Sequence, residues 1–180
     1  LTAVNDHTGT IIDQRGIDVL TLKKHVKSTG GIAGYKDLPE HSRDDFFAHP
    51  VDILIPAALE SQIGPHEAEL LNVKLVAEGA NGPTTPEGEK ILVAKGTDFI
   101  PDVVANCGGV IVSYFEWVQN KTCKFWVEEE VQKELRRIIT SAYLDVVNIS
   151  ARHNTDMRSA SFIKAFGNLQ NVYAQRGIFP

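Results

Sequence analysis

The residues best able to do chemistry in this sequence lie directly after short apolar runs. Asn81 lies in the glycine-rich turn of residues 79–83, which follows the apolar run of residues 75–77. The small residues leave the backbone of such a turn open to a ligand, and the amide side chain of Asn81 would form a hydrogen bond to that ligand. Two interpretations stay open from these residues alone: a ligand-binding turn, or an ordinary loop between a strand and a helix.

The segment after this turn predicts the start of a helix. Thr84 as N-cap would put Glu87 at the third helical position and complete a capping box, whereas Thr85 as N-cap would put Pro86 first. Either start leaves Glu87 and Glu89 in the first helical turn, where carboxylates repel a phosphate. We therefore predict that this helix does not hold the phosphates of a ligand.

Asp6 is a second candidate, at the carboxyl end of a strand predicted at residues 1–4. In dinucleotide-binding folds an acid at that place receives ribose hydroxyls, about 20 residues after a G-x-G-x-x-G fingerprint. No such fingerprint occurs in the 180 residues. From its position alone, Asp6 is better explained as a turn residue, so the ribose interpretation needs further support.

Val110 and Ser113 lie one turn apart on a helix predicted after the pair Gly108-Gly109. Two glycines inside a helix cost about 2 kcal/mol relative to alanine, so we expect a close approach of backbone or ligand there. Ser113 has no nearby His or Asp in the sequence to activate it, and we do not predict a nucleophile. It could hydrogen-bond a substrate carboxylate or bond back to its own helix.

The elements that must position these residues alternate between strand and helix. Apolar runs at residues 51–55, 75–77 and 98–101 predict strands; helices are predicted at 18–28 with Asp18 as N-cap, after Ser42, at 65–71 and at 86–95. This alternation predicts an α/β fold with a mostly parallel sheet. The run at 51–55 is nearly continuous in apolar residues, as in strands covered on both faces, and ends in the small residues Ala57 and Ala58.

The last third of the sequence predicts two long helices. The first is predicted to be about 39 Å long at 1.5 Å per residue, and its apolar stripe covers residues 127–149. The second begins at Thr155 or Asp156 and ends at Gly177, with an apolar stripe expected to face inward, formed by Phe162, Phe166, Leu169 and Tyr173. Structural packing is the preferred interpretation of both helices.

Composition excludes several classes of function. Hydrophobic residues make up 43% and charged residues 23%, the balance of a soluble globular protein, and a net charge of −5 argues against nucleic acid or an anionic membrane as partner. Cys107 and Cys123 are too few for a disulfide framework, so we expect reduced thiols and a cytoplasmic location. The six histidines show no metal-ligand spacing, and we predict no metal site.

The motifs taken together resemble the glutamate dehydrogenase family, within the Glu/Leu/Phe/Val dehydrogenase superfamily. The similarity runs over the whole sequence, and its most specific segments are residues 52–60 (DILIPAALE), 77–87 (AEGANGPTTPE), 106–117, 158–160 and 176–180. The turn sequence Gly-Pro-Thr-Thr-Pro favours glutamate dehydrogenase over the leucine, phenylalanine and valine enzymes, whose equivalent turn lacks it.

The resemblance implies an NAD(P)-dependent oxidative deamination of L-glutamate to 2-oxoglutarate and ammonia. It implies a partial Rossmann-like dinucleotide-binding domain at residues 1–120, with helices on both faces of the sheet and the first βα unit missing. Residues 121–180 would form a helical segment that packs on this domain and toward an absent N-terminal substrate domain. The family's catalytic lysine and aspartate belong to that absent domain, so no catalytic residue is assigned in this sequence. We expect the chain alone to be inactive and the full enzyme to be a homo-hexamer.

The resemblance also implies roles for particular residues. Asp6 would contact the adenosine ribose, Ala57 and Ala58 would line the dinucleotide, and the nicotinamide and its ribose would lie near Asn106 and Asn81. Val110 and Ser113 would face the substrate, with Ser113 bonded to its distal carboxylate.

An acid at the ribose position favours NAD because it repels the 2′-phosphate of NADP, although members that accept both coenzymes keep an acid there. Two other functions stay open. One is a leucine, phenylalanine or valine dehydrogenase, and the other is a non-catalytic nucleotide-binding module.

Overall fold

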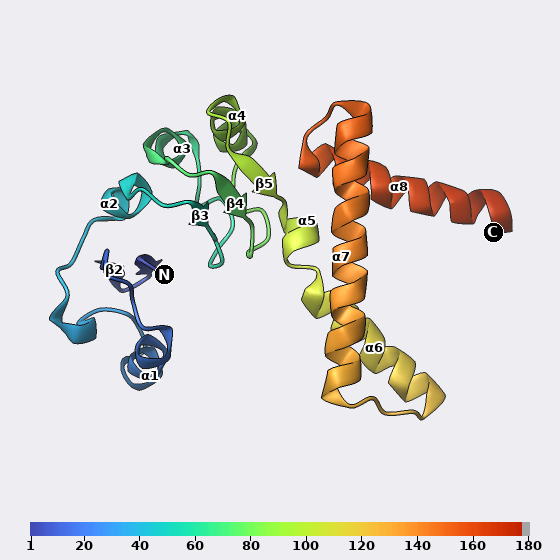
Figure 1. Ribbon diagram of the computed structural model, residues 1–180, viewed down its shortest axis with the longest axis horizontal. Helices are drawn as coiled ribbons and strands as arrows, with labels where there is room; N and C mark the ends of the chain where they lie inside the picture. The colour runs from blue at the N-terminus through green and yellow to red at the C-terminus, as the bar shows by residue number, and fades with distance from the viewer. Residues whose placement is uncertain (178–180) are drawn as a thin grey trace. The chain divides into compact units, whose positions relative to one another are not determined.

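The computed structural model describes residues 1–177, which form two compact units (Figure 1). Unit 1 comprises Leu1–Val76 and Gly82–Asp98, and unit 2 comprises Ala77–Asn81 and the chain from Phe99 onward. These units differ from the division at residue 120 that the sequence suggested, and that division stays a prediction.

Unit 1 opens with a hairpin of two antiparallel strands, β1 (Ala3–Asp6) and β2 (Gly9–Ile12). Asp6 ends β1, as predicted, and pairs with Gly9 across a two-residue turn. Strand β2 was not predicted from the sequence. Its residue Ile11 is buried in a small core with Ile17, Leu22, Ile32 and Tyr35.

Local capping rules explain the first helices of unit 1. Helix α1 (Val19–Thr29) begins where the Asp18 side chain accepts hydrogen bonds from two backbone N–H groups, and it ends at Gly30 with a φ of 89°. A short 3₁₀ helix, η1 (Tyr35–Asp37), follows. Helix α2 (Arg43–Ala48) begins at a capping box between Ser42 and Asp45. The predicted starts of both α helices are therefore confirmed.

Helices α3 (Pro65–Leu70) and α4 (Pro86–Ala94) complete the helices of unit 1. Thr85 is the N-cap of α4 and accepts from the Gly88 N–H, which settles the choice left open between Thr84 and Thr85. The Lys95 ammonium, just after α4, donates to three carbonyl oxygens at the end of α3, with distances of 2.8, 2.6 and 3.3 Å. Lys95 thus supplies partners that the last carbonyls of a helix otherwise lack.

The strands β3 (Ile53–Leu54), β4 (Leu75–Ala77) and β5 (Asp98–Ile100) form a three-stranded sheet in that order, with β3 parallel to β4. The α/β fold predicted from the sequence is confirmed. The expectation that the first of these strands is covered on both faces is wrong, because Leu54 is 8% exposed but Ile53 is 54% exposed. Alternate side chains of a strand point to opposite faces, and here only one face packs in the core.

Unit 2 is built on helices α5 (Asp102–Ala105), α6 (Gly108–Thr122), α7 (Glu128–His153) and α8 (Met157–Arg176). Figure 1 shows α6 beside the N-terminal part of α7, with α8 beside the C-terminal part. Helix α7 has 26 residues, which corresponds to the predicted length. Its core cluster with α5 and α8 consists of Val104, Val146 and Ala160.

Helix α8 packs differently from the prediction. Its start at the N-cap Asp156 and its end at Gly177 are as expected, but the stripe predicted to face inward is exposed: Phe162 48%, Phe166 64%, Leu169 55% and Tyr173 57%. The helix instead buries the small residues Ala160 and Ser161 in its first turns. Small side chains let α8 approach its neighbours closely, while the larger ones on the stripe remain in contact with solvent.

Three further observations concern residues 1–177. None of their helices is long and apolar enough to cross a membrane. They contain no group of three or more His, Cys, Asp or Glu side chains that could hold a metal ion. Cys107 and Cys123 are both free thiols, as the sequence predicted.

Candidate functional site

The two asparagines singled out by the sequence are hydrogen-bonded to each other in unit 2. Asn81 lies in the turn after β4, and Asn106 is the residue at which the one-turn helix α5 ends. The side-chain nitrogen of Asn106 donates to the side-chain oxygen of Asn81 at 2.7 Å. Each amide group carries two N–H donors, so this bond uses one of four and leaves three for a ligand.

An ionic cluster, defined as Glu78, Asp102 and Arg158, lies next to the same two turns; Glu78 is fully buried, and Asp102 and Arg158 are half-buried. Glu78 follows β4 directly and is 0% exposed; one of its carboxylate oxygens accepts from the Asp102 backbone N–H at 2.9 Å and from Arg158 at 2.6 Å. Arg158, from α8, also donates to the Asp102 carboxylate at 2.9 Å. This cluster was not predicted from the sequence. A carboxylate directly after a buried strand was the available signal, because a buried charge needs a partner.

Val110 and Ser113 lie on the first turns of α6, and both side chains are exposed. The glycines before them do not make room for neighbouring backbone within the described residues. A Cβ at Gly108 would meet only the end of the Ile139 side chain at 3.8 Å, and one at Gly109 would meet no atom within 4 Å. No neighbouring backbone of the described residues explains the two glycines, and ligand approach stays a prediction.

Cys107 lies between the amide pair and α6, but its thiol is not activated. Burial raises the pKa of this thiol, and its sulfur donates to the Val104 carbonyl at 3.1 Å. A raised pKa keeps the thiol protonated at neutral pH, and the protonated form is a poor nucleophile. The geometry thus offers polar binding groups and no nucleophile at this position.

Asp6 is held by its own turn. One carboxylate oxygen accepts from the Thr8 backbone N–H at 2.7 Å and the Thr8 hydroxyl at 2.6 Å, while the other accepts from the Ile32 N–H at 3.1 Å. Partial burial would raise the pKa of Asp6, but these hydrogen bonds outweigh it and hold the pKa below the ordinary value. The carboxylate is therefore anionic and fixed. It offers about four acceptor sites, so one remains after these three bonds.

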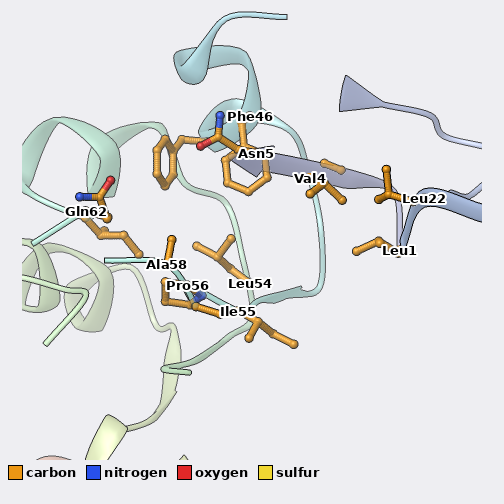
Figure 2. Close-up of a pocket in the computed structure, with 14 residues that line it drawn as sticks. Leu1, Val4, Asn5, Leu22, Phe46, Leu54, Ile55, Pro56, Ala58 and Gln62 are labelled. Atoms are coloured by element: carbon orange, nitrogen blue, oxygen red, sulfur yellow. The ribbon is translucent and has the colours of Figure 1, made fainter. Parts of the chain in front are cut away.

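Ala57 and Ala58 line a hollow of about 420 Å³ in unit 1. Figure 2 shows Phe46, Leu54, Ile55 and Pro56 among the side chains around it, with Val4 and Leu1 contributed from the side of β1. The lining is mainly apolar, as binding sites for flat organic ligands commonly are.

A second hollow, of about 710 Å³, has Ala58 in common with the first and is also lined by Asp6. The structure therefore brings two of the predicted residues to one cavity. Arg43 lines it too, but its guanidinium is already paired with the Glu67 carboxylate and donates to the Gln62 carbonyl at 2.7 Å. The Arg43 charge is largely compensated within the protein.

The Glutamate/Leucine/Phenylalanine/Valine dehydrogenase family matches residues 1–177 of the chain. The glutamate dehydrogenase of Thermotoga maritima is 40% identical over 180 residues, which cover 100% of this chain and 43% of the relative. The NADP-specific glutamate dehydrogenase A1 of Halobacterium salinarum is 36% identical over the whole chain and 44% of its own length.

Among solved structures, the hetero-hexameric glutamate dehydrogenase of Thermus thermophilus in its leucine-bound form matches with a TM-score of 0.90 and 28% identity. The match covers 99% of this chain and 42% of that one. The chain thus spans about two fifths of the length of the relatives it matches. The family match over nearly every residue shows that the chain belongs to the Glutamate/Leucine/Phenylalanine/Valine dehydrogenase family.

Proposed function

We propose that this chain forms the coenzyme-binding part of an NAD(P)-dependent glutamate dehydrogenase, which deaminates L-glutamate oxidatively to 2-oxoglutarate and ammonia. The observation that carries the proposal is the bonded pair of Asn81 and Asn106, which presents free amide donors at the ends of neighbouring elements. The curated relatives in Thermotoga maritima and Halobacterium salinarum are both glutamate dehydrogenases and support the same reaction.

The residues present fit a dinucleotide in two places. In unit 1, the apolar hollow beside Ala57 and Ala58 suits a flat ring system, and the fixed Asp6 carboxylate accepts hydrogen bonds from ribose hydroxyls. In unit 2, the amides of Asn81 and Asn106 donate to ribose or carboxamide oxygens. When bound, the coenzyme supplies the acceptor for the hydride that leaves the amino acid.

Charge at the ribose position favours NAD over NADP. Asp6 is anionic, and the nearby Arg43 is already paired with Glu67, so its cation offers little compensation to a 2′-phosphate. Two charges of the same sign repel at short range, most strongly away from bulk water.

Substrate binding is proposed at the start of α6. Val110 contacts the aliphatic part of glutamate, and the Ser113 hydroxyl donates to the distal carboxylate. Both side chains are exposed and lie on one helical face, one turn apart. Hydrogen bonds to a charged group contribute more than those between neutral groups, which gives this serine the means to select glutamate over aliphatic amino acids.

The remainder of the active enzyme is proposed to come from a substrate-binding domain that carries the catalytic lysine and aspartate. This chain spans 43% of the Thermotoga maritima relative, which leaves room for such a domain in a protein of that length. The exposed apolar stripe on α8 is proposed to pack toward that domain. We further propose a hexameric assembly and a cytoplasmic location for the whole enzyme.

The test joins this chain to the N-terminal part of the Thermotoga maritima relative, the part that precedes the matched region. Glutamate-dependent reduction of NAD by this chimera is expected, and the Asn81→Ala variant should raise the KM for the coenzyme. Asn120→Ala, at an exposed position on α6, is the matched control and should leave it unchanged. A folded chimera that oxidises no amino acid would contradict the proposal.

The isolated 180-residue chain separates the enzyme from the non-catalytic alternative. Calorimetric titration with NAD is expected to give no saturable binding, because the chain has no G-x-G-x-x-G fingerprint to hold the phosphates. Saturable micromolar binding by the isolated chain would instead favour a nucleotide-binding module.

A further inference from the structure

We infer that Arg158 is a positioning residue: through Glu78 and Asp102, its guanidinium sets the distance and orientation of Asn81 and Asn106. The significance of this pair for the coenzyme rests on the proposed function, but the positioning itself does not. The inference concerns unit 2 alone, because all five residues belong to it.

The first step is the cap on α5. This helix has four residues, and its own N-cap, Pro101, makes no side-chain hydrogen bond. The Glu78 carboxylate takes that place, accepting from the Asp102 N–H at 2.9 Å, while the Glu78 backbone N–H donates to the Ile100 carbonyl at 3.1 Å. The end of β4 is thereby joined to the start of α5 by both its backbone and its side chain.

The second step is the pairing of both carboxylates with Arg158 of α8. Arg158 donates to the same Glu78 oxygen at 2.6 Å and to the Asp102 carboxylate at 2.9 Å, so one planar guanidinium spans both acids. Glu78 is 0% exposed, and the Arg158 side chain is 24% exposed. A planar fork fixes the relative orientation of two carboxylates, which a lysine ammonium cannot do to the same degree.

The third step is the short stretch of backbone that connects each carboxylate residue to one of the two asparagines. Asn81 is three residues beyond Glu78, and Asn106 is one helical turn beyond Asp102, with its backbone N–H bonded to the Asp102 carbonyl at 2.9 Å. The turn and the short helix are thus joined twice, by the ionic cluster and by the amide bond of 2.7 Å. Water competes with the amide bond, which lies between an exposed and a half-buried residue, but it does not reach the Glu78 carboxylate, which is fully buried. The cluster therefore holds the two turns in register.

The hydrogen bond between Asn81 and Asn106 should therefore depend on the ionic cluster. Weakening the cluster should loosen the amide pair, because Arg158 bonds to the two acids that precede the asparagines in their turns. The matched control is Arg137, an exposed arginine on α7 paired with Glu134 three residues earlier, at 2.8 Å through its Nε. It has the same chemistry and lies in the same unit, but this ion pair stays within one helix.

The experiment is NMR on the 180-residue chain labelled with nitrogen-15 and carbon-13, with the side-chain amides of its asparagines as reporters. The Asn106 amide should show a scalar coupling across its hydrogen bond to Asn81 in the unmodified chain and in Arg137→Lys. Arg158→Lys should lose that coupling, with the amide protons shifted toward free values. The Asn5 amide, bonded to the Thr10 hydroxyl in unit 1 at 2.7 Å, should not change in any variant.

Glu78→Gln is the second variant, because it keeps one oxygen acceptor while it removes the charge and replaces the other oxygen by an NH2 group. It should weaken the coupling less than Arg158→Lys. A coupling of unchanged size in a folded Arg158→Lys or Glu78→Gln chain would overturn the inference, as would its absence from the unmodified chain. Loss of the unit 2 fold in both variants would also overturn it, because the cluster would then be merely structural.

A second arm uses the chimera described above. Arg158→Lys is expected to raise the KM for NAD roughly five- to tenfold, as for a weakened hydrogen-bonding pair, with the KM for glutamate unchanged. An unchanged coenzyme KM together with a lost NMR coupling would leave the positioning role intact and count against the proposed function instead.

Discussion

The carboxylate of Asp6 accepts a hydrogen bond from the backbone N–H of Ile32 at 3.1 Å, across 26 positions of sequence. A side chain at the end of β1 thus anchors the loop that follows α1. The Thr8 hydroxyl accepts from the same N–H at 2.9 Å and from Ala33 at 3.1 Å. One acidic turn therefore supports a neighbouring loop and presents a fixed anion to the hollow beside it.

This arrangement predicts an acid-dependent loss of stability. The hydrogen bonds from Thr8 and Ile32 outweigh partial burial and hold the pKa of Asp6 below its ordinary value of 3.8. A lowered folded-state pKa stabilises the fold at pH values above the unfolded pKa, and that contribution disappears as the pH falls through the folded pKa. Urea unfolding at a series of pH values should show the wild-type advantage over Asp6→Asn shrinking below pH 3.8. An advantage that does not vary with pH would contradict this.

Gly88 predicts a steric effect that can be isolated. A Cβ at Gly88, in the first turn of α4, would lie 2.6 Å from the Ile63 carbonyl oxygen, whereas one at Gly109, in the first turn of α6, would meet no atom within 4 Å. Gly88→Ala should therefore lower the free energy of unfolding by about 1–3 kcal/mol, as overpacking does. Gly109→Ala should raise it by about 0.5–1 kcal/mol through helix propensity. Equal effects in denaturant titration would be inconsistent with the close contact at Gly88.

Ser113 predicts the choice of substrate. In the chimera, Ser113→Ala should weaken use of glutamate relative to norvaline by about 1.5–3 kcal/mol, because a hydrogen bond to a charged carboxylate is lost. The ratio of the two kcat/KM values measures it directly. Ser141→Ala, at an exposed position on α7, serves as control. If Ser113→Ala left that ratio unchanged, the distal carboxylate would have to be bound elsewhere, and an aliphatic substrate would become the better proposal.

Two phenylalanines predict losses of stability of very different size. Phe115 is 2% exposed and packs against Trp126 with ring centroids 5.0 Å apart, whereas Phe166 on α8 is 64% exposed. Phe115→Ala should cost about 3–5 kcal/mol and Phe166→Ala less than about 0.5 kcal/mol. If α8 packs against a further domain, Phe166→Ala should weaken assembly of the chimera, which size-exclusion chromatography would detect. A large loss of stability for Phe166→Ala in the isolated chain would refute the exposed position of this stripe.

Local rules made much of the fold predictable. Asp18, Ser42 and Asp156 begin helices at the predicted positions because a cap depends on only a few neighbouring residues. Strand β2 was missed since its few residues follow a tight turn and show little alternation. The stripe on α8 was assigned to the wrong environment because periodicity identifies an apolar face but does not say what covers it.

The residues of the candidate site also divide into those that local sequence indicates and those that only the fold brings together. Asp6, Ala57, Ala58 and Asn81 became candidates because each follows an apolar run, and the ends of strands are where ligands bind in α/β proteins. Asn106 required the family resemblance. The bond between Arg158 and Glu78 spans 80 positions, and no local pattern specifies such a pairing. Their proximity is a product of the fold, which brings α8 back onto the turn after β4.

The hydrogen bonds from Lys95 to the end of α3 have a consequence for the unfolding of unit 1. All three protons of this ammonium are taken up by carbonyls of the 68–71 segment. Neither α3 nor α4 can therefore fray at this end without leaving a charge or several carbonyls without partners. The two helices should open together as one cooperative unit, so that their slowest-exchanging amides share a single opening free energy.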